Sequence, residues 1–202
     1  MKVLLGISGA SGATYGVRTL SLLLARGAEL HVLVTKTAWG ILAAEVWDGN
    51  LPGGMAARRK GLARLSSSAR PFRLYAEDDF GIPFASGSNA PDAMIIAPCS
   101  MGTLGRIAHG VSSSVLTRCA DVALKERKPL VLVARETPLS VIHLENMLTL
   151  ARAGAHILPA CPGFYHRPET VSGLVDFVVS RALSCIGVDA GVLPRWGEGK
   201  EE

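Results

Sequence analysis

The chain has 202 residues, of which 49% are hydrophobic and 19% are charged, with 22 glycines and a formal net charge of +4. This length and apolar content favour one folded domain with its own core and exclude a disordered or fibrous chain. The positive charge comes without a long Lys/Arg run, which argues against nucleic acid as a partner and suits small anionic ligands.

The sequence also predicts a cytoplasmic protein. Its four cysteines form no CxxC pair and are typical of free thiols in a reducing compartment. No apolar run approaches the ~20 residues that a membrane helix needs, and the apolar start of the chain is too short for a signal peptide. We therefore expect no membrane partner.

Apolar runs alternate with helical periodicity along the chain. Runs without polar alternation are typical of strands that helices cover on both faces, so the pattern predicts an α/β fold. We expect a single-domain, doubly wound, mostly parallel sheet within residues 1–190, followed by a tail at 191–202. In chain order the predicted elements are a strand at 2–7, a helix at 12–27, a strand at 29–35, a helix at 36–47, a surface excursion at 48–70, a strand at 92–98, a turn and helix start within 97–110, a helix at 112–127, a strand at 128–134, a helix at 138–154, a strand at 155–160 and a helix at 168–187.

A glycine-rich turn, GISGASGAT at 6–14, follows the first predicted strand. Such a turn lets backbone N–H groups and a helix N-terminus approach an anion at the carboxyl edge of a sheet. The spacing is neither GxGxxG nor a P-loop, and the second strand ends in Thr35 and Lys36 where a dinucleotide site would place a carboxylate. A hydroxyl beside a lysine suits a phosphate, so the turn favours a mononucleotide such as FMN. Tight packing of strand and helix without a ligand remains the alternative.

A second turn of the same kind lies within 97–110, where Ser100, Gly102 and Thr103 open a helix. The hydroxyls can cap that helix, or they can contact a ligand across the sheet from Ser11. Two such turns on one chain favour a nucleotide crevice.

Five segments in order, GISGASGA (6–13), ASGSNAPDAMIIAPCSMGTL (85–104), TRCADVALKERKPLVLVARETPLSVIHLENM (117–147), PGFYHRP (162–168) and LPRWGE (193–198), resemble the UbiX-type flavin prenyltransferases. The resemblance implies transfer of a dimethylallyl group from dimethylallyl phosphate to N5 and C6 of reduced FMN, without a metal. It also implies a homododecamer, and a UbiD-type decarboxylase that uses the prenylated FMN.

The resemblance further implies roles for individual residues. FMN contacts are implied for Gly9, Ala10, Ser11, Thr35, Ser100, Met101, Gly102, Thr103 and Arg118. Contacts to the prenyl phosphate are implied for Lys125, Arg135, Tyr165 and Arg181. Catalytic positions around the reacting centre are implied for Ser11, Glu45, Glu136 and Trp196. Relatives often carry Ser where this chain has Thr35, and the hydroxyl is retained.

The chemistry of prenyl transfer needs a neutralised leaving phosphate, a surface that tolerates an allylic cation, and a base. The acidic run at 77–79 is interpreted as a solvated loop rather than a metal site, so Arg and Lys supply the charge. Trp196 offers either an aromatic face for a cation or an apolar plug at a subunit contact. Glu136 follows a strand directly and acts either as general acid/base or in an ion pair with Arg135.

Two other functions stay open. A flavoprotein decarboxylase of this fold would need a histidine near the first glycine turn, where this chain has Ala13, Thr14 and Tyr15. A non-catalytic FMN carrier would not need the cluster of Arg135, Glu136 and their neighbours. The histidines have no ligand spacing and are interpreted as structural.

Overall fold

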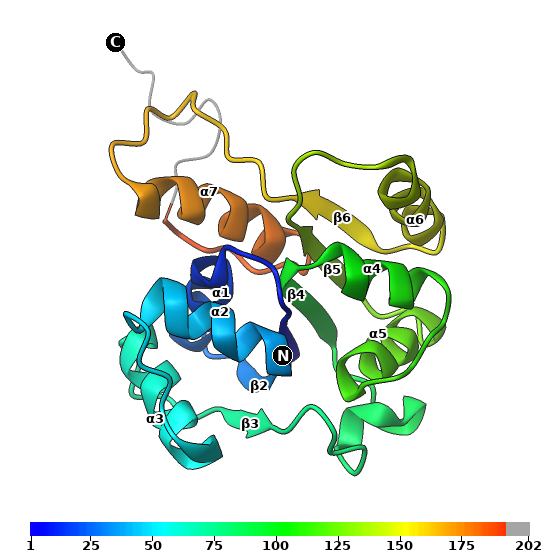
Figure 1. The fold of residues 1–202 in the computed structure, drawn as a ribbon, viewed down its shortest axis with the longest axis horizontal. Coiled ribbons are helices and arrows are strands. Elements are labelled where there is room, and N and C mark those ends of the chain that lie inside the picture. The colour runs from blue at the N-terminus through cyan, green and yellow to red at the C-terminus, as the bar shows by residue number, and fades with distance from the viewer. Residues whose placement is uncertain (193–202) are drawn as a thin grey trace.

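Parallel strands form one sheet in the order β3-β2-β1-β4-β5-β6 in the computed structural model, which describes residues 1–192 (Figure 1). Every neighbouring pair is parallel, so the predicted doubly wound sheet is confirmed. The direction of winding reverses between β1 and β4, and this is where such sheets open a ligand crevice at their carboxyl edge. The strands are β1 (Lys2–Ile7), β2 (Glu29–Val34), β3 (Arg73–Tyr75), β4 (Ala93–Cys99), β5 (Leu130–Ala134) and β6 (His156–Pro159).

Helices cover both faces of the sheet because successive strand residues point to opposite faces. Val3, Leu5 and Ile7 of β1 belong to one buried cluster, with α1, α2, α3 and α7, whereas Leu4 belongs to a second cluster, with α4, α5 and α6. The helices are α1 (Ala13–Ala25), α2 (Lys36–Val46), α3 (Gly54–Ser66), α4 (Met101–Ala108), α5 (Val115–Lys125), α6 (Val141–Arg152) and α7 (Val171–Ser184), with short 3₁₀ turns η1 (Pro83–Ala85) and η2 (Gly87–Asn89).

The segment 48–70, interpreted from its polarity as a surface excursion, contains the helix α3. Leu62 is fully buried, and the Ser21 hydroxyl of α1 donates a 2.8 Å hydrogen bond to the carbonyl of Ser66. Only one or two side chains of α3 enter the core, so its apolar periodicity is too weak to identify from the sequence. The three-residue strand β3, which follows it at the sheet edge, gave no signal either.

Of the expected tail at 191–202, only residues 191 and 192 lie among the described residues. Across residues 1–192, none of the helices is both long and apolar enough to span a membrane.

The loops that carry the candidate site residues leave the sheet at its carboxyl edge. Backbone hydrogen bonds continue the strand pairing beyond the strand ends, from Thr35 N to Ile7 O (3.0 Å) and from Arg135 N to Cys99 O (3.1 Å). The start of each loop is therefore fixed relative to its neighbour, which gives the site a rigid base.

Candidate active site

The glycine turn after β1 is shaped by contacts within the chain. A Cβ on Gly9 would lie 2.7 Å from the Thr37 side chain of α2, and Gly12 has a φ of 99°. Glycine is required at both positions for close approach and for a left-handed backbone. Packing of the strand against the helices is thus enough to explain both glycines, so the glycines by themselves do not show that the turn binds a ligand. Ala10 is buried, whereas Ser11 is exposed at the carboxyl edge and accessible to a ligand.

The N-terminus of α1 carries an internal anion. The carboxylate of Glu45, near the end of α2, accepts hydrogen bonds from the N–H groups of Gly12 (2.9 Å) and Ala13 (2.7 Å). This satisfies two of the unpaired donors at the start of the helix and complements its dipole. Glu45 therefore lies beside Ser11, as expected if both face one reacting centre, and a ligand phosphate must find its donors elsewhere.

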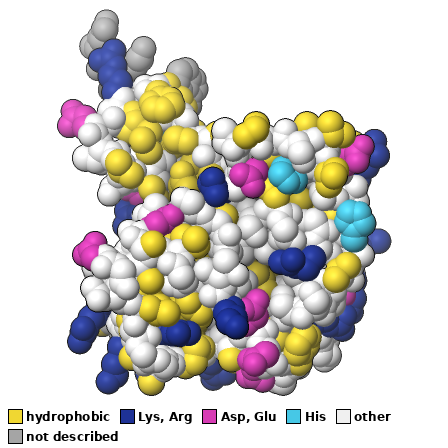
Figure 2. Space-filling model, viewed as in Figure 1, with side chains coloured by type: hydrophobic (Ala, Val, Ile, Leu, Met, Phe, Trp, Pro, Cys, Tyr) yellow, Lys and Arg dark blue, Asp and Glu magenta, His cyan; other side chains and the backbone are white. Residues whose placement is uncertain are grey.

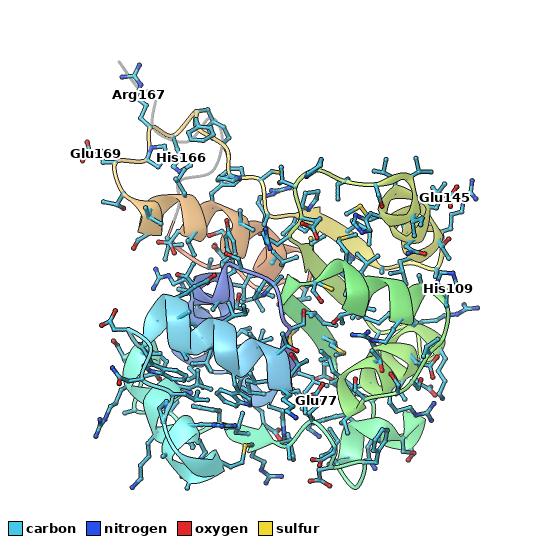
Figure 3. All side chains as sticks on the ribbon, in the orientation of Figure 1. Glu77, His109, Glu145, His166, Arg167 and Glu169 are labelled. Carbon is cyan, nitrogen blue, oxygen red and sulfur yellow. The ribbon has the colours of Figure 1, made fainter. Side chains whose placement is uncertain are left out.

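The N-terminus of α2 is closed in two ways. The hydroxyl of Thr35, which is buried, accepts a 3.2 Å hydrogen bond from Ala38 N. The carboxylate of Glu77 accepts one from Lys36 N, and the Glu77 carbonyl accepts another from Val115 N, so this residue lies between the first turns of α2 and α5 (Figure 3). Residues 77–79 lie in the turn after β3 with Asp78 and Asp79 exposed, whereas Glu77 is partly exposed and caps α2.

The turn after β4 caps α4, as one of the two interpretations expects. Ser100 Oγ accepts a 3.3 Å hydrogen bond from Thr103 N and donates to Thr103 Oγ1 at 3.0 Å. Met101 and Thr103 are buried, and Met101 packs in the core cluster below α4. Only the backbone of this turn, the exposed Gly102 and the partly exposed Ser100 are accessible to a ligand.

Arg135 directly follows β5 and lies alongside the glycine turn, since its Cγ is 4.0 Å from the position of a Cβ on Gly12. Its Nε is buried and has no hydrogen-bond partner within the described part of the chain. Among residues 1–192 it forms no ion pair, so the pairing with Glu136 considered above is absent. Glu136 is exposed, and its Oε1 accepts a 3.1 Å hydrogen bond from Thr137 N. A buried guanidinium N–H with no acceptor among residues 1–192 thus lies at the carboxyl edge beside the glycine turn.

Tyr165 lies on the loop between β6 and α7. Its ring packs edge-on against Phe177 and His166, at centroid distances of 5.7 and 5.5 Å. The residue is 57% exposed, so this anchored ring is accessible to a ligand.

Two predicted cations, Lys125 and Arg181, do not join this group. Lys125 and Arg181 lie ten residues beyond the first residues of α5 and α7, which places them about 15 Å along each helix at 1.5 Å per residue. They therefore lie toward the amino edge of the sheet, under opposite faces, and Lys125 pairs with Glu126. Arg118 lies in the second turn of α5, where it donates to the Ala85 carbonyl and pairs with Asp121 at 2.8 Å.

Trp196, the remaining catalytic prediction, lies outside the described residues. Within those residues, no three His, Cys, Asp or Glu side chains converge to hold a metal ion. Burial raises the pKa of the Cys99 thiol, at the end of β4, to about 12. The thiol therefore stays protonated and is a poor nucleophile.

Sequence reasoning missed two residues that organise the site. Glu77 caps α2 from 41 residues away, and Ser8 joins the turns after β1 and β4 across 92 residues. Neither lies in a periodic pattern. Ser8 has one signal, its position directly after the predicted strand at 2–7, whereas Glu77 lies beside no predicted element, because β3 gave no signal.

Comparisons with known proteins identify the family and the fold. The Flavoprotein family model matches residues 1–183. The flavin prenyltransferase UbiX of Pseudomonas aeruginosa is 50% identical over 198 residues, which cover 98% of this chain and 94% of that protein. The crystal structure of AnUbiX in complex with FMN and dimethylallyl pyrophosphate has a TM-score of 0.86 at 37% identity, covering 96% of each chain. A dodecameric FMN-dependent UbiX-like decarboxylase from Escherichia coli O157:H7 has a TM-score of 0.84 at 38% identity, covering 97% of this chain and 99% of that one.

Proposed function

This chain belongs to the Flavoprotein family and, within it, to the UbiX flavin prenyltransferases, and on this premise we propose that it transfers a dimethylallyl group from dimethylallyl phosphate to reduced FMN. Its product is FMN prenylated at N5 and C6. The observation that carries the proposal is the buried, unpartnered Nε of Arg135 beside the glycine turn. Buried donors are normally paired, so an orphaned guanidinium N–H at the crevice fits a site that receives an anion.

The carboxyl edge fits a mononucleotide. The exposed Ser11 and the accessible backbone around Gly102 flank the crevice between β1 and β4, and Thr35 lies at the adjacent strand end. The α1 N-terminus is occupied by Glu45. We therefore assign the flavin to Ser11. The phosphate of FMN is assigned to Thr35, whose hydroxyl accepts from Ala38 N and keeps its own hydrogen to donate to a phosphate oxygen, while the Lys36 N–H is already taken by Glu77.

Reduced FMN supplies the nucleophilic N5 and C6 atoms. Arg135 and the Tyr165 hydroxyl hold the prenyl phosphate and stabilise its charge as the C–O bond breaks, which replaces a metal ion. N5 bonds to C1 of the dimethylallyl group and loses its proton as the phosphate leaves. C6 then bonds to C3 of that group, the carbon C2 between them gains a proton, and C6 releases one, so the flavin gains C5H8 in total. Glu136 accepts that proton or delivers one to the leaving phosphate, and Ser11 and Glu45 orient the proton near N5.

We propose that the site is completed by other copies of the chain, as in a homododecamer. Lys125 and Arg181 lie too far from Arg135 to share one phosphate within a single copy, whereas symmetric copies can bring them together. An apolar surface supports assembly: Leu139, Val141, Ile142, Leu144 and Leu148 on and before α6 are exposed, and hydrophobic side chains gather there at the upper right of the molecule (Figure 2). A patch of this kind is typical of a subunit contact.

The product leaves the enzyme for a UbiD-type decarboxylase in the cytoplasm under this proposal. Decarboxylation by this chain itself is the second candidate, because one relative is described as an FMN-dependent decarboxylase. Ala13, Thr14 and Tyr15 stand where the decarboxylases of this fold would place a histidine, which favours prenyl transfer.

An anaerobic incubation tests the proposal. The purified protein is mixed with reduced FMN and either dimethylallyl phosphate or the pyrophosphate, and the released flavin is analysed by mass spectrometry. We expect a gain of one C5H8 unit, abolished in Glu136→Gln and retained in Glu169→Gln, which removes an exposed carboxylate from the loop before α7.

Unmodified FMN with both donors would contradict prenyl transfer. Release of CO2 from a carboxylic acid by the chain alone would favour the decarboxylase, and bound FMN with neither reaction would favour a carrier.

A further inference from the structure

Ser8, the first residue after β1, lies at the reversal point of the sheet between the two turns assigned to FMN. It is 1% exposed and therefore cannot contact a ligand itself. Its position between β1 and β4 places it at the base of the crevice.

Three hydrogen bonds converge on Ser8. Its hydroxyl donates to the carbonyl of Pro98 at 3.0 Å and accepts from the N–H of Ser100 at 2.8 Å. Its own N–H donates to the same Pro98 carbonyl at 3.2 Å. One small side chain thus fastens the end of β4 and the cap of α4 to the start of the glycine turn.

The hydroxyl is used both as donor and as acceptor, and this makes it difficult to replace. Without it the part-buried Ser100 N–H would lose its acceptor, because the neighbouring Ser8 N–H is itself a donor and pairs with the Pro98 carbonyl. A buried donor without an acceptor is costly, so the turn would shift toward another acceptor or admit water. Ser100 and Gly102 would move with it, relative to Ser11.

We propose that Ser8 is a positioning residue for FMN, which sets the separation between the turn at 9–11 and the turn at 100–103 through its hydroxyl. The inference rests on the proposed function, since it takes both turns to contact FMN. Because binding groups must be held to within about 0.5 Å of their productive geometry, a small shift between the turns weakens FMN binding without unfolding the chain.

Ser66 provides a matched control. It is 3% exposed, its hydroxyl donates to the Ala63 carbonyl at 2.8 Å and accepts from Ser68 N at 3.4 Å, and it lies at the end of α3. Ser8→Ala and Ser66→Ala therefore remove the same buried hydroxyl with the same bonding pattern, but only one of them lies between the FMN turns. Ser8→Cys keeps the side-chain volume with a much weaker hydrogen-bonding group.

The experiment measures the FMN dissociation constant by flavin fluorescence and the urea midpoint of all three variants. We expect Ser8→Ala and Ser8→Cys to weaken FMN binding and raise the KM for FMN at least tenfold, with the KM for the prenyl donor unchanged. Ser66→Ala should bind FMN as the wild type does, at a comparable loss of stability.

Equal FMN affinity in Ser8→Ala and Ser66→Ala would overturn the inference, as would full recovery in Ser8→Cys, which would point to volume rather than hydrogen bonding. Should Ser8→Ala fail to fold, Ser8→Cys carries the same comparison. Failure of the proposed function is distinct, because the wild type would then not prenylate FMN at all.

Discussion

The carboxylate of Glu45 accepts the N–H of Gly12, which joins the last turn of α2 to the first turn of α1. Glu45, 33 residues after Gly12 in the sequence, thereby supplies the negative charge at the N-terminus of α1, beside the exposed Ser11. The glycine turn consequently presents its serine to a ligand, while its helix N-terminus is already neutralised.

Glu45→Gln should lower the unfolding free energy of the ligand-free protein by about 0.3–1 kcal/mol, because a neutral amide interacts less favourably with a helix N-terminus. Prenyl transfer should slow at the same time, since the charge lies beside Ser11. Urea denaturation and single-turnover assays measure the two effects. Glu145→Gln, in the middle of α6, is the stability control and should change the midpoint little. An unchanged stability of Glu45→Gln would show that the charge does not matter to α1.

Arg135→Met should separate stability from function. The variant removes a buried Nε that has no partner among the described residues, so the ligand-free unfolding free energy should be unchanged or higher. The KM for the prenyl donor should rise about 10–100-fold, as expected when a hydrogen bond to a charged group is lost. Thermal denaturation and steady-state kinetics test both, with the exposed Arg64→Met of α3 as the control. A strongly destabilised variant would mean that Arg135 serves the fold.

Mixing two weakened variants tests whether copies share the site. At prenyl donor concentrations below the KM, Arg135→Ala and Lys125→Ala should each lose activity about 10–100-fold, because each removes a cation from the prenyl phosphate. Co-refolding equal amounts should restore about one site in four, since every site then draws the two residues independently from different copies. Activity is measured against each variant refolded alone. If no activity returns, Arg135 and Lys125 must act from the same copy.

His31 should make the stability depend on pH. Burial lowers the pKa of this imidazole on β2, against the opposing effect of its hydrogen bond with Glu29, and the coulombic effects of Arg73 and Lys2 add to the lowering. The unfolded chain therefore binds a proton that the folded chain resists. Neutral His31 therefore contributes its full stabilisation above a pH of about 6.5, the ordinary pKa of the unfolded chain. This stabilisation is lost as the pH falls from there through the lowered pKa of the folded protein.

The urea midpoint, followed from pH 7.5 to 5, measures this loss. His31→Gln should flatten the profile, whereas His109→Gln, an exposed histidine on α4's C-terminal side, should leave it unchanged. A wild-type midpoint that does not fall below pH 6.5 would contradict the assignment.

The sheet and the edge that carries the site could be predicted from the sequence because their signals are local. The run DAMIIAP at 92–98 is apolar throughout, which is typical of a strand covered on both faces, and β4 lies within one residue of it. Thr35, Ser100 and Arg135 each follow such a run directly, so their place at one edge follows from parallel topology. The spacing of the glycine turn indicated only a phosphate-bearing ligand. The resemblance to a family identified the substrates as FMN and dimethylallyl phosphate.

What could not be predicted depends on pairs that are distant in the chain. Nothing near Ser8 indicates that its hydroxyl meets Ser100, and nothing near Glu77 indicates that its carboxylate caps α2. The helix α3 was missed because its polar face dominates its composition. The separation of Lys125 from Arg135 follows from the predicted elements as well: a helix that ends before a parallel strand ends at the amino edge, and Arg135 follows that strand at the carboxyl edge. The resemblance, by contrast, assigned both residues to one phosphate.

The exposed aliphatic side chains of α6 have a practical consequence for anyone who assays the protein. If association covers them and also completes the phosphate site, specific activity will fall on dilution, and the folded state will be linked to protein concentration. Turnover per chain measured at nanomolar concentration would then underestimate the enzyme. Titrating the protein concentration should come before the comparison of any two variants.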